Sequence, residues 1–137
     1  MPREINPWAM YPRKTATALL PETLKMEVTT RANALIETVL KPKYIQPPPA
    51  HPQFNYLVTI YGKWHHKAFY LCSEYRVAHP HATTPSFEAK FARMQYAGNQ
   101  RFHLSYMRYT GQWIQLYTDL TVDECMEALR DEPYFSP

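Results

Sequence analysis

The chain has 137 residues, of which 45% are hydrophobic, 15% aromatic and 20% charged. This length suits one domain, and the composition excludes an intrinsically disordered protein. No apolar run approaches the roughly 20 residues of a membrane-spanning helix, and the first residues lack the apolar core of a secretion signal. We therefore expect a cytoplasmic protein with no membrane partner.

The net charge of +3 is unevenly distributed along the chain. Residues 54–117 hold seven Lys/Arg and two Asp/Glu, whereas residues 118–137 hold one Arg and six Asp/Glu. The basic segment predicts an anionic partner, unless the acidic tail packs beside it and neutralises it within the molecule. The sequence leaves both interpretations open.

Residues 1–16 predict an extended arm, because recurrent prolines remove the N–H donors that helices and sheets need. The arm precedes a single domain over 17–137. Its apolar side chains, Trp8, Met10 and Tyr11, are candidate partner contacts. The arm either wraps its own domain or docks on another chain.

The stretch Pro21–Lys41 predicts the first helix, because apolar residues recur there every three or four positions. Pro21 suits the first helical position, and we expect Pro42 to end the helix. The apolar stripe that should cover one face of a sheet consists of Leu24, Val28, Ala32, Leu35 and Val39.

A proline-rich spacer over Ile45–Gln53 leads into the first strands. Alternating apolar residues over Phe54–Val77 predict a hairpin, and we place its reversal near Gly62-Lys63. The stretch His79–Ser86 breaks the alternation and predicts a loop.

Three further strands are predicted over Phe87–Tyr117, where aromatic and β-branched residues are frequent. Turns at Ala97–Gln100 and Thr110-Gly111 separate them, because glycine favours chain reversal. We expect this antiparallel meander to form the centre of the sheet.

The segment Thr121–Glu124 has the pattern of a capping box, so we expect a C-terminal helix that ends before Pro133. The predicted fold is α+β, a single antiparallel five-stranded meander-like sheet. A long N-terminal helix packs on one face, and a short C-terminal helix follows the last strand. The apolar face of this last helix is Val122, Cys125, Met126 and Leu129.

Two short motifs, MRYTGQW at 107–113 and DEPYF at 131–135, follow the predicted helix, spacer and hairpin. Together they resemble a family of small bacterial proteins known as a domain of unknown function. The resemblance covers roughly 21–137 and leaves the arm outside. It implies this fold and a bacterial origin, and it lends no activity.

Metal and nucleophile chemistry have little support, and we expect no metal or cofactor. His65 and His66 are adjacent, so in a strand they would point to opposite faces, and zinc needs three or four ligands. Three glycines are too few for a phosphate-binding loop. Cys72 and Cys125 are too few for a disulfide framework, and we expect both to be buried.

One pattern is compatible with catalysis. Glu88 and Lys90 are two apart on a strand and share a face, as metal-dependent nucleases require of their carboxylate and lysine. Glu74 would have to replace the usual upstream aspartate, because no aspartate precedes Asp119. The alternative is a cross-strand ion pair on a solvated face.

Basic and aromatic residues are interspersed along the meander, a mixture that binds single-stranded nucleic acid through base stacking and phosphate contacts. The candidate cations are Arg93, Arg101 and Arg108, and the candidate rings include Tyr109 and Trp113. The alternative is that many of the rings are core.

Our leading hypothesis is a non-catalytic binding or assembly module that acts through a protein partner or self-association. An open sheet rich in aromatic residues leaves apolar surface that a partner or a second copy would cover. The arm and the five sheet residues named above are its candidate contacts. Single-stranded nucleic-acid binding and metal-dependent cleavage are the alternatives.

Overall fold

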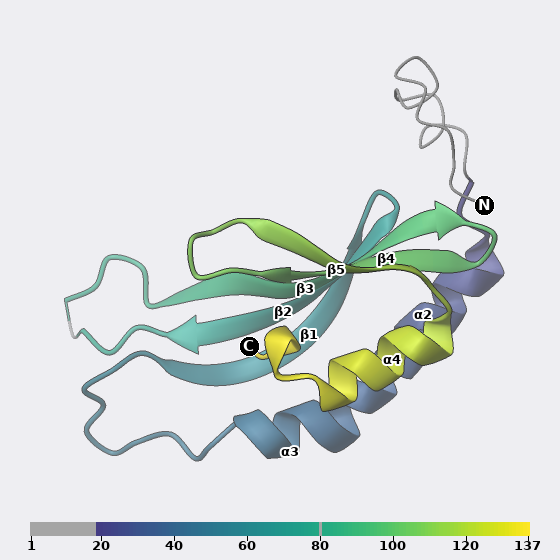
Figure 1. Cartoon of the computed structure of the whole chain (residues 1–137). Helices are drawn as coiled ribbons and strands as arrows, with labels where there is room; N and C mark the ends of the chain where they lie inside the picture. Colours follow the sequence, from purple (N-terminus) through teal and green to yellow (C-terminus); the bar gives the residue numbers. More distant parts are fainter. Residues whose placement is uncertain (1–18, 80) are drawn as a thin grey trace.

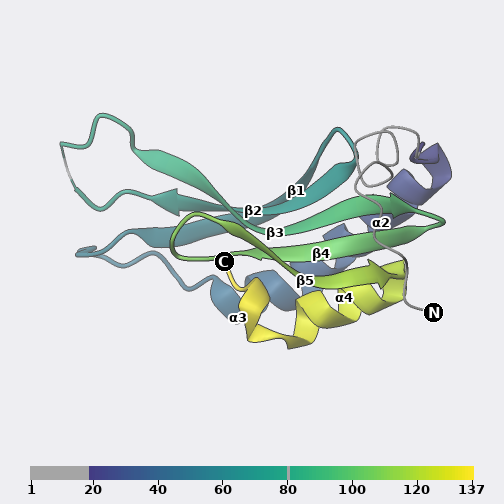
Figure 2. The same cartoon turned by 45° about the horizontal axis from the view of Figure 1, so that its top comes forward.

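Five antiparallel strands form one sheet, and the helices lie on one side of it (Figure 1, Figure 2). The structure is a computed structural model that describes residues 19–79 and 81–137. The predicted arm over 1–16 lies outside the described residues.

The strands are neighbours in space in their order along the chain, so the sheet is a meander, and every neighbouring pair is antiparallel. The predicted five-stranded meander is therefore confirmed. The strands are β1 (Tyr56–His65), β2 (Ala68–Arg76), β3 (Ser86–Gly98), β4 (Arg101–Met107) and β5 (Trp113–Leu120).

Two helical segments flank the strands in the sequence. The first comprises α2 (Glu22–Leu35), the π-helical turn η1 (Ile36–Leu40) and α3 (Lys41–Tyr44). The second comprises α4 (Val122–Asp131) and the 3₁₀ turn η2 (Pro133–Phe135). Helices α2 and α4 contact each other, and both pack on the same face of the sheet (Figure 1).

The hydrophobic core fills the space between the two helical segments and this face of the sheet. The predicted α+β fold is thus confirmed, and among the described residues no helix covers the other face (Figure 2). The largest fully buried side chains are Phe69, Phe102, Phe135, Ile36, Leu40, Ile60, Leu71, Met94, Leu104 and Leu129.

The prediction that Pro42 ends the first helix is wrong, because helical structure continues to Tyr44. The Lys41 N–H donates to the Ile36 carbonyl, five residues back, so the turn before the proline is wider than an α-turn. The wider turn relieves the clash between a proline ring and the carbonyl four residues earlier.

The same π turn shifts the buried stripe of this helix. Leu24, Val28 and Ala32 are buried as predicted, and the next fully buried positions are Ile36 and Leu40. Steps of four residues overshoot a full α-helical turn by about 40°, and the extra residue of a π turn cancels part of this drift. The two remaining predicted positions, at 35 and 39, are partly buried against the core.

The predicted hairpin reversal near Gly62-Lys63 is also wrong, because both residues lie inside β1. The chain reverses at His66, which has a φ of 56°. Position 62 of the strand is a glycine because a Cβ there would lie 2.2 Å from Cζ of the buried Phe69 ring. Here glycine marks a close approach of backbone to side chain and not a turn.

The other two predicted turns are confirmed. Gly98 closes β3 with a φ of 92°, and Asn99 and Gln100 follow with φ values of 52° and 57°. Positive φ at both turn residues matches the right-handed twist of the strands. In the turn between β4 and β5, Gly111 has a φ of 88°.

The capping box of α4 is confirmed in both directions. The Glu124 N–H donates to the Thr121 hydroxyl at 3.1 Å, and the Thr121 N–H donates to the Glu124 carboxylate at 2.8 Å. The helix ends at Asp131, before Pro133, as predicted. These contacts satisfy N–H groups that a helix start otherwise leaves unpaired.

Replacing Gly62 with alanine tests the corrected hairpin. We expect Gly62→Ala to lower the free energy of unfolding by about 1–3 kcal/mol, because the new methyl overlaps a ring that the core holds in place. Urea unfolding measures this loss. The double variant Gly62→Ala/Phe69→Leu should lose less than the sum of the single variants. A neutral or stabilising Gly62→Ala, as expected of a glycine in open space, would contradict the register.

Candidate functional site

Strand alternation sends every second side chain to the face of the sheet that the helices leave open. Lys63 of β1 lies opposite Tyr70 of β2, which lies opposite Arg93 of β3. Ser105 of β4 continues this row beside Arg93, and Gln115 of β5 completes it. The chain neighbours of the row are buried in the core on the opposite face: Phe69, Leu71, Met94 and Leu104.

Long side chains from three strands converge above Ser105. The Arg93 guanidinium lies 5.0 Å from the centre of the Trp113 ring, and the Lys90 ammonium lies 5.8 Å from the centre of the Tyr70 ring. The two rings are 5.8 Å apart and tilted by 58°. Ser105 is small and 1% exposed, so residues of β3 and β5 can meet over it. We call Tyr70, Lys90, Arg93 and Trp113 the basic–aromatic cluster.

Arg93 is the least compensated cation of this cluster. It forms no ion pair with any described carboxylate, and its hydrogen bond to the Ser105 hydroxyl is long, at 3.5 Å. Its Nε is buried without a hydrogen-bond partner. An unpaired buried donor is costly, and costlier when it is charged. The Trp113 ring offsets part of that cost through cation–π contact.

The two lysines of the open face share one carboxylate. Lys63 contacts both oxygens of Glu88 at 2.9 Å, and Lys90 lies 3.5 Å from it. The Tyr61 hydroxyl also donates to Glu88. The hydrogen bonds from Tyr61 and then Lys63 lower the pKa of Glu88 to about 2. One negative charge therefore faces two lysines.

Two hollows lie on the open face, on either side of Tyr70. Lys63 and Trp113 line the first, of about 390 Å³. Arg93 and Lys67 line the second, of about 340 Å³. Tyr70 and His65 line both, so the hollows adjoin and follow the sheet surface.

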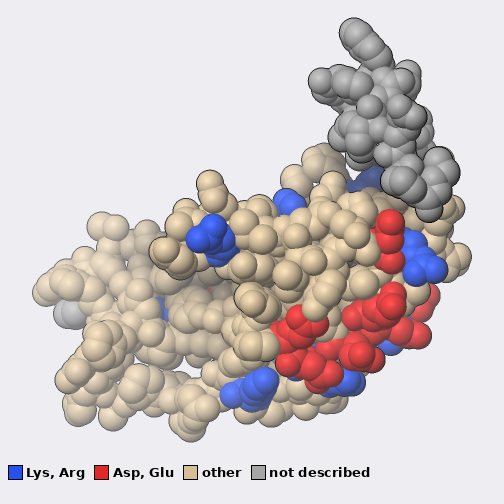
Figure 3. Space-filling view, in the orientation of Figure 1, with Lys and Arg blue, Asp and Glu red and all other residues tan. Residues whose placement is uncertain are grey.

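The acidic end of the chain lies on the other side of the sheet. Figure 3 shows Asp and Glu side chains gathered over the helical layer, where α4 lies. Asp123 pairs with Arg31 of α2, and Glu124 lies 4.0 Å from Arg101. Of the described sheet cations, only Arg101 pairs with α4, so the acidic tail does not neutralise the open face. The carboxylates of α4 are Asp123, Glu124, Glu127 and Asp131.

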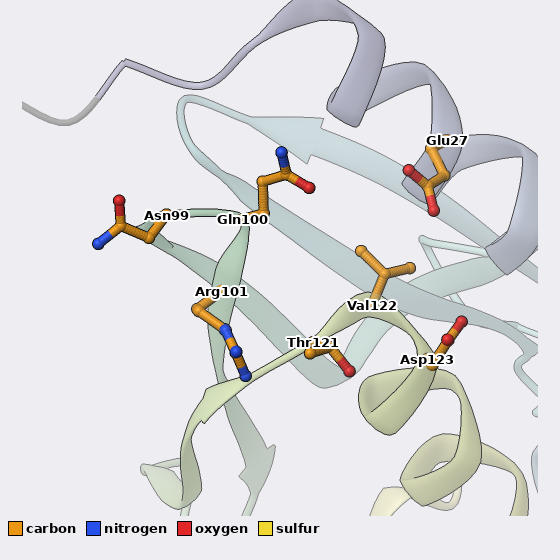
Figure 4. Close-up of a pocket in the computed structure, with 7 residues that line it drawn as sticks. All are labelled: Glu27, Asn99, Gln100, Arg101, Thr121, Val122 and Asp123. Atoms are coloured by element: carbon orange, nitrogen blue, oxygen red, sulfur yellow. The ribbon is translucent and has the colours of Figure 1, made fainter.

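Arg101, one of the predicted sheet cations, lies at a separate hollow (Figure 4). This hollow has a volume of about 490 Å³ and lies between the β3–β4 turn, α2 and the start of α4. Glu27 and Asp123 line it together with Arg101, so its charges are mixed. The largest of the three hollows described is therefore not an electropositive one.

Arg108 and Tyr109 lie in the turn between β4 and β5. The Arg108 guanidinium is 5.9 Å from the Tyr109 ring, and Tyr109 is 94% exposed. Of the five predicted sheet residues, the structure thus brings Arg93 and Trp113 together. It places Arg101 at the first position of β4 and the Arg108–Tyr109 pair just beyond the other end of that strand.

The predicted nuclease residues do meet on the open face. Glu74 lies directly opposite Glu88 in the register, and Lys90 is within 3.5 Å of Glu88. Glu88 is already engaged by Tyr61 and Lys63. Within residues 19–79 and 81–137, no group of three or more His, Cys, Asp or Glu side chains is arranged to hold a metal ion.

Some of the remaining candidates lie among the described residues and some lie outside them. Trp8, Met10 and Tyr11 lie outside the described residues, so their role stays a prediction. Cys72 and Cys125 are buried free thiols, as expected. Burial raises the pKa of Cys72 to about 11 and that of Cys125 to about 12, which keeps both protonated at neutral pH.

The family described as Domain of unknown function (DUF3024) matches residues 20–137. The chain belongs to this family. The match confirms the resemblance carried by the 107–113 and 131–135 motifs, and the predicted arm lies outside it. No curated protein and no solved structure matches the chain. The described part of this DUF3024 chain contains no helix of the length and apolarity that crossing a membrane requires.

Sequence reasoning missed two residues of this DUF3024 site, Lys63 and Tyr70. Placing the reversal near Gly62-Lys63 removed Lys63 from its strand and from its partner. Had the turn been placed at His66, the pairing of Lys63 with Tyr70 would have followed from counting along the two strands. Alternation would then have placed both residues on the face of Arg93.

The lowered pKa of Glu88 predicts how stability depends on pH. Its carboxyl has a pKa of about 2 in the folded chain, against an ordinary value of 4.5. The folded state therefore resists protonation, and the stability that Glu88 contributes is lost as pH falls from 4.5 toward 2. Thermal unfolding followed by circular dichroism should show a shallower decline over this window for Glu88→Gln than for the wild type.

The other carboxylates are present in both the wild type and Glu88→Gln, so their effect on the pH dependence of stability cancels when the two are compared. Glu74→Gln is the matched control, because it removes a carboxylate that accepts no hydrogen bond from the described residues. Parallel pH profiles for Glu88→Gln and the wild type would show that the contacts of Glu88 with Tyr61 and Lys63 contribute nothing to the stability of the fold.

Proposed function

We propose that this protein is a non-catalytic binding module that holds a negatively charged partner on the open face of its sheet. The observation that supports this most is Arg93, a cation packed on Trp113 that has no described carboxylate partner. Three of the four α4 carboxylates pair with Arg31, Arg101 and Arg130, and none of the described α4 carboxylates pairs with a cation of the basic–aromatic cluster. An anion from another molecule would supply the negative charge that Arg93 lacks among the described residues.

The charges on this face support an anionic partner further. The register directs four cations of β1, β2 and β3 to the open face, against Glu74 and Glu88. The β1–β2 turn adds Lys67 beside the second hollow. Such an excess steers anions toward a surface and raises association rates at low salt. The four strand cations are Lys63, Arg76, Lys90 and Arg93.

Arg93 is also held in an orientation suited to recognition. Its planar guanidinium presents a fixed fork of donors, which matches the paired oxygens of phosphate, sulfate or carboxylate groups. Contact with Trp113 and Ser105 limits the rotamers of the side chain before a partner arrives. Less conformational entropy is then lost on binding.

The protein-partner hypothesis assumed that the sheet exposes an apolar face that a partner would cover. The structure supports this assumption less well than it supports an anionic partner. The rings on the open face lie under cations, and the exposed large apolar residues come from separate parts of the chain. Single exposed residues of this kind are normal on a protein surface. Self-association, a cytoplasmic location and a bacterial origin stay predictions. The exposed residues are Leu19, Met26, Phe54, Phe87, Tyr109 and Tyr134.

Metal-dependent cleavage by Glu74, Glu88 and Lys90 stays the alternative. The close pairing of Glu74 with Glu88 favours it, because two facing carboxylates attract a divalent cation. Against it, the two lysines around Glu88 already neutralise the charge that such an ion would need. Mg²⁺-dependent cleavage of labelled DNA that disappears in Glu88→Ala would favour the enzyme.

Heparin, a polyanion without nucleobases, tests the proposal. We expect the protein to bind heparin at low salt and Arg93→Gln to bind about tenfold more weakly, because one charge-assisted contact is lost. Titration calorimetry measures the affinity, and thermal unfolding verifies that the variant is folded. Lys90→Gln should also weaken heparin binding.

The matched control is Arg130→Gln, which removes the same charge from α4, where Arg130 pairs with Asp131. Its affinity for heparin should equal that of the wild type. Equal weakening by Arg93→Gln and Arg130→Gln would mean that net charge alone governs binding. That result, or no heparin binding at low salt, would overturn the proposal.

A further inference from the structure

We infer that the partner of the open face is a single-stranded nucleic acid, with its bases on the rings of the basic–aromatic cluster and a phosphate at Arg93. This inference rests on the proposed function, since it names the anion that the same face binds. It is carried by three features of that face: its rings, its shape and its uncharged polar side chains.

The cluster combines two neighbouring rings with two cations, the groups that bind the bases and the phosphates of a nucleic acid. Tyr70 and Trp113 are 5.8 Å apart, and each has a cation within 6 Å of its ring. Stacking on aromatic rings or on a guanidinium plane is how proteins hold unpaired bases, while Lys and Arg contact the phosphates between them. A polyanion without bases would contact Arg93 and Lys90 but would gain no stacking on the rings or on the guanidinium that covers Trp113.

The shape of the face suits an extended strand. The row from Lys63 to Gln115 crosses all five strands, a distance of about 19 Å at the usual strand spacing of about 4.8 Å. The two hollows adjoin at Tyr70 of this row, and the second extends to Gln95 and the β1–β2 turn. An open sheet of comparable width in RNA-recognition domains stacks two or three bases. A duplex hides its base faces and would not reach these rings.

A second row supplies groups that can bond the edges of bases. His103 of β4 lies opposite Gln95 of β3, and Gln95 lies opposite Ala68, which faces His65 of β1. Gln95 lines the second hollow together with Arg93. Amide and imidazole groups donate and accept hydrogen bonds, as the Watson–Crick edges of unpaired bases require.

Fluorescence anisotropy of labelled strands tests the inference. The probe is a single strand of about 12 nucleotides, the order of one binding site, compared with an abasic strand of the same number of phosphates. We expect the strand with bases to bind the full chain on the order of tenfold more tightly or better, because stacking adds to the phosphate contacts. The matching duplex should bind no better than the abasic strand.

Two variants separate the bases from the phosphates. Trp113→Ala should remove most of the preference for the strand with bases, whereas Trp113→Phe keeps a ring and should retain part of it. Arg93→Gln should weaken both strands and reduce the slope of log affinity against log salt by about one. Tyr134→Ala removes an exposed ring from the helical side and should change neither affinity.

The outcomes distinguish this inference from the proposed function. Equal affinity for the two strands, with heparin binding intact, would overturn the nucleic-acid inference and leave the anion-binding face standing. Displacement of the labelled strand by a lower concentration of polyglutamate than of unlabelled strand would point to an acidic protein and also overturn it. Binding of neither heparin nor any strand would overturn both.

Discussion

The two helices and the hydrophobic core occupy one face of the sheet, and strand alternation then sends every second side chain to a face with no helix on it. The close approach of Gly62 to the buried Phe69 ring fixes the register of the first hairpin. A slip of one residue would exchange the two faces, moving Phe69 and Leu71 to the surface and Tyr70 into the core. The composition of the open face is therefore set by packing on the other one.

This one-sided burial also separates the charges. The acidic helix α4 must present Val122, Cys125 and Leu129 to the core, so its carboxylates lie on the helical side of the sheet. There they contact Arg31 and Arg101, and no described carboxylate of α4 pairs with Lys63, Lys90 or Arg93. The sequence has a basic middle and an acidic end. In the fold, the cations of the basic–aromatic cluster lie on the open face and the carboxylates of α4 lie on the helical side.

Local patterns predicted the fold well, since each depended on residues close in sequence. The capping box at Thr121 and the turn at Gly98 were confirmed because short-range hydrogen bonds and φ preferences decide them. The errors at Gly62 and Pro42 arose where a distant ring or a π turn overrides the residue's usual preference. For the site, Arg93 and Trp113 were both among the five candidate sheet residues, but the sequence did not pair them. Their meeting above Ser105 depends on non-adjacent strands, which spacing does not reveal.

The most direct test of the account is to map anion binding residue by residue. Amide and indole N–H resonances of the isotope-labelled chain would be followed in two-dimensional NMR spectra while heparin is added. The account predicts shifts for Trp113, for Arg93 and along the row from Lys63 to Gln115, with α4 unchanged. Shifts confined to the hollow at Arg101, or to the turn at Arg108 and Tyr109, would show that the open face is not the binding surface.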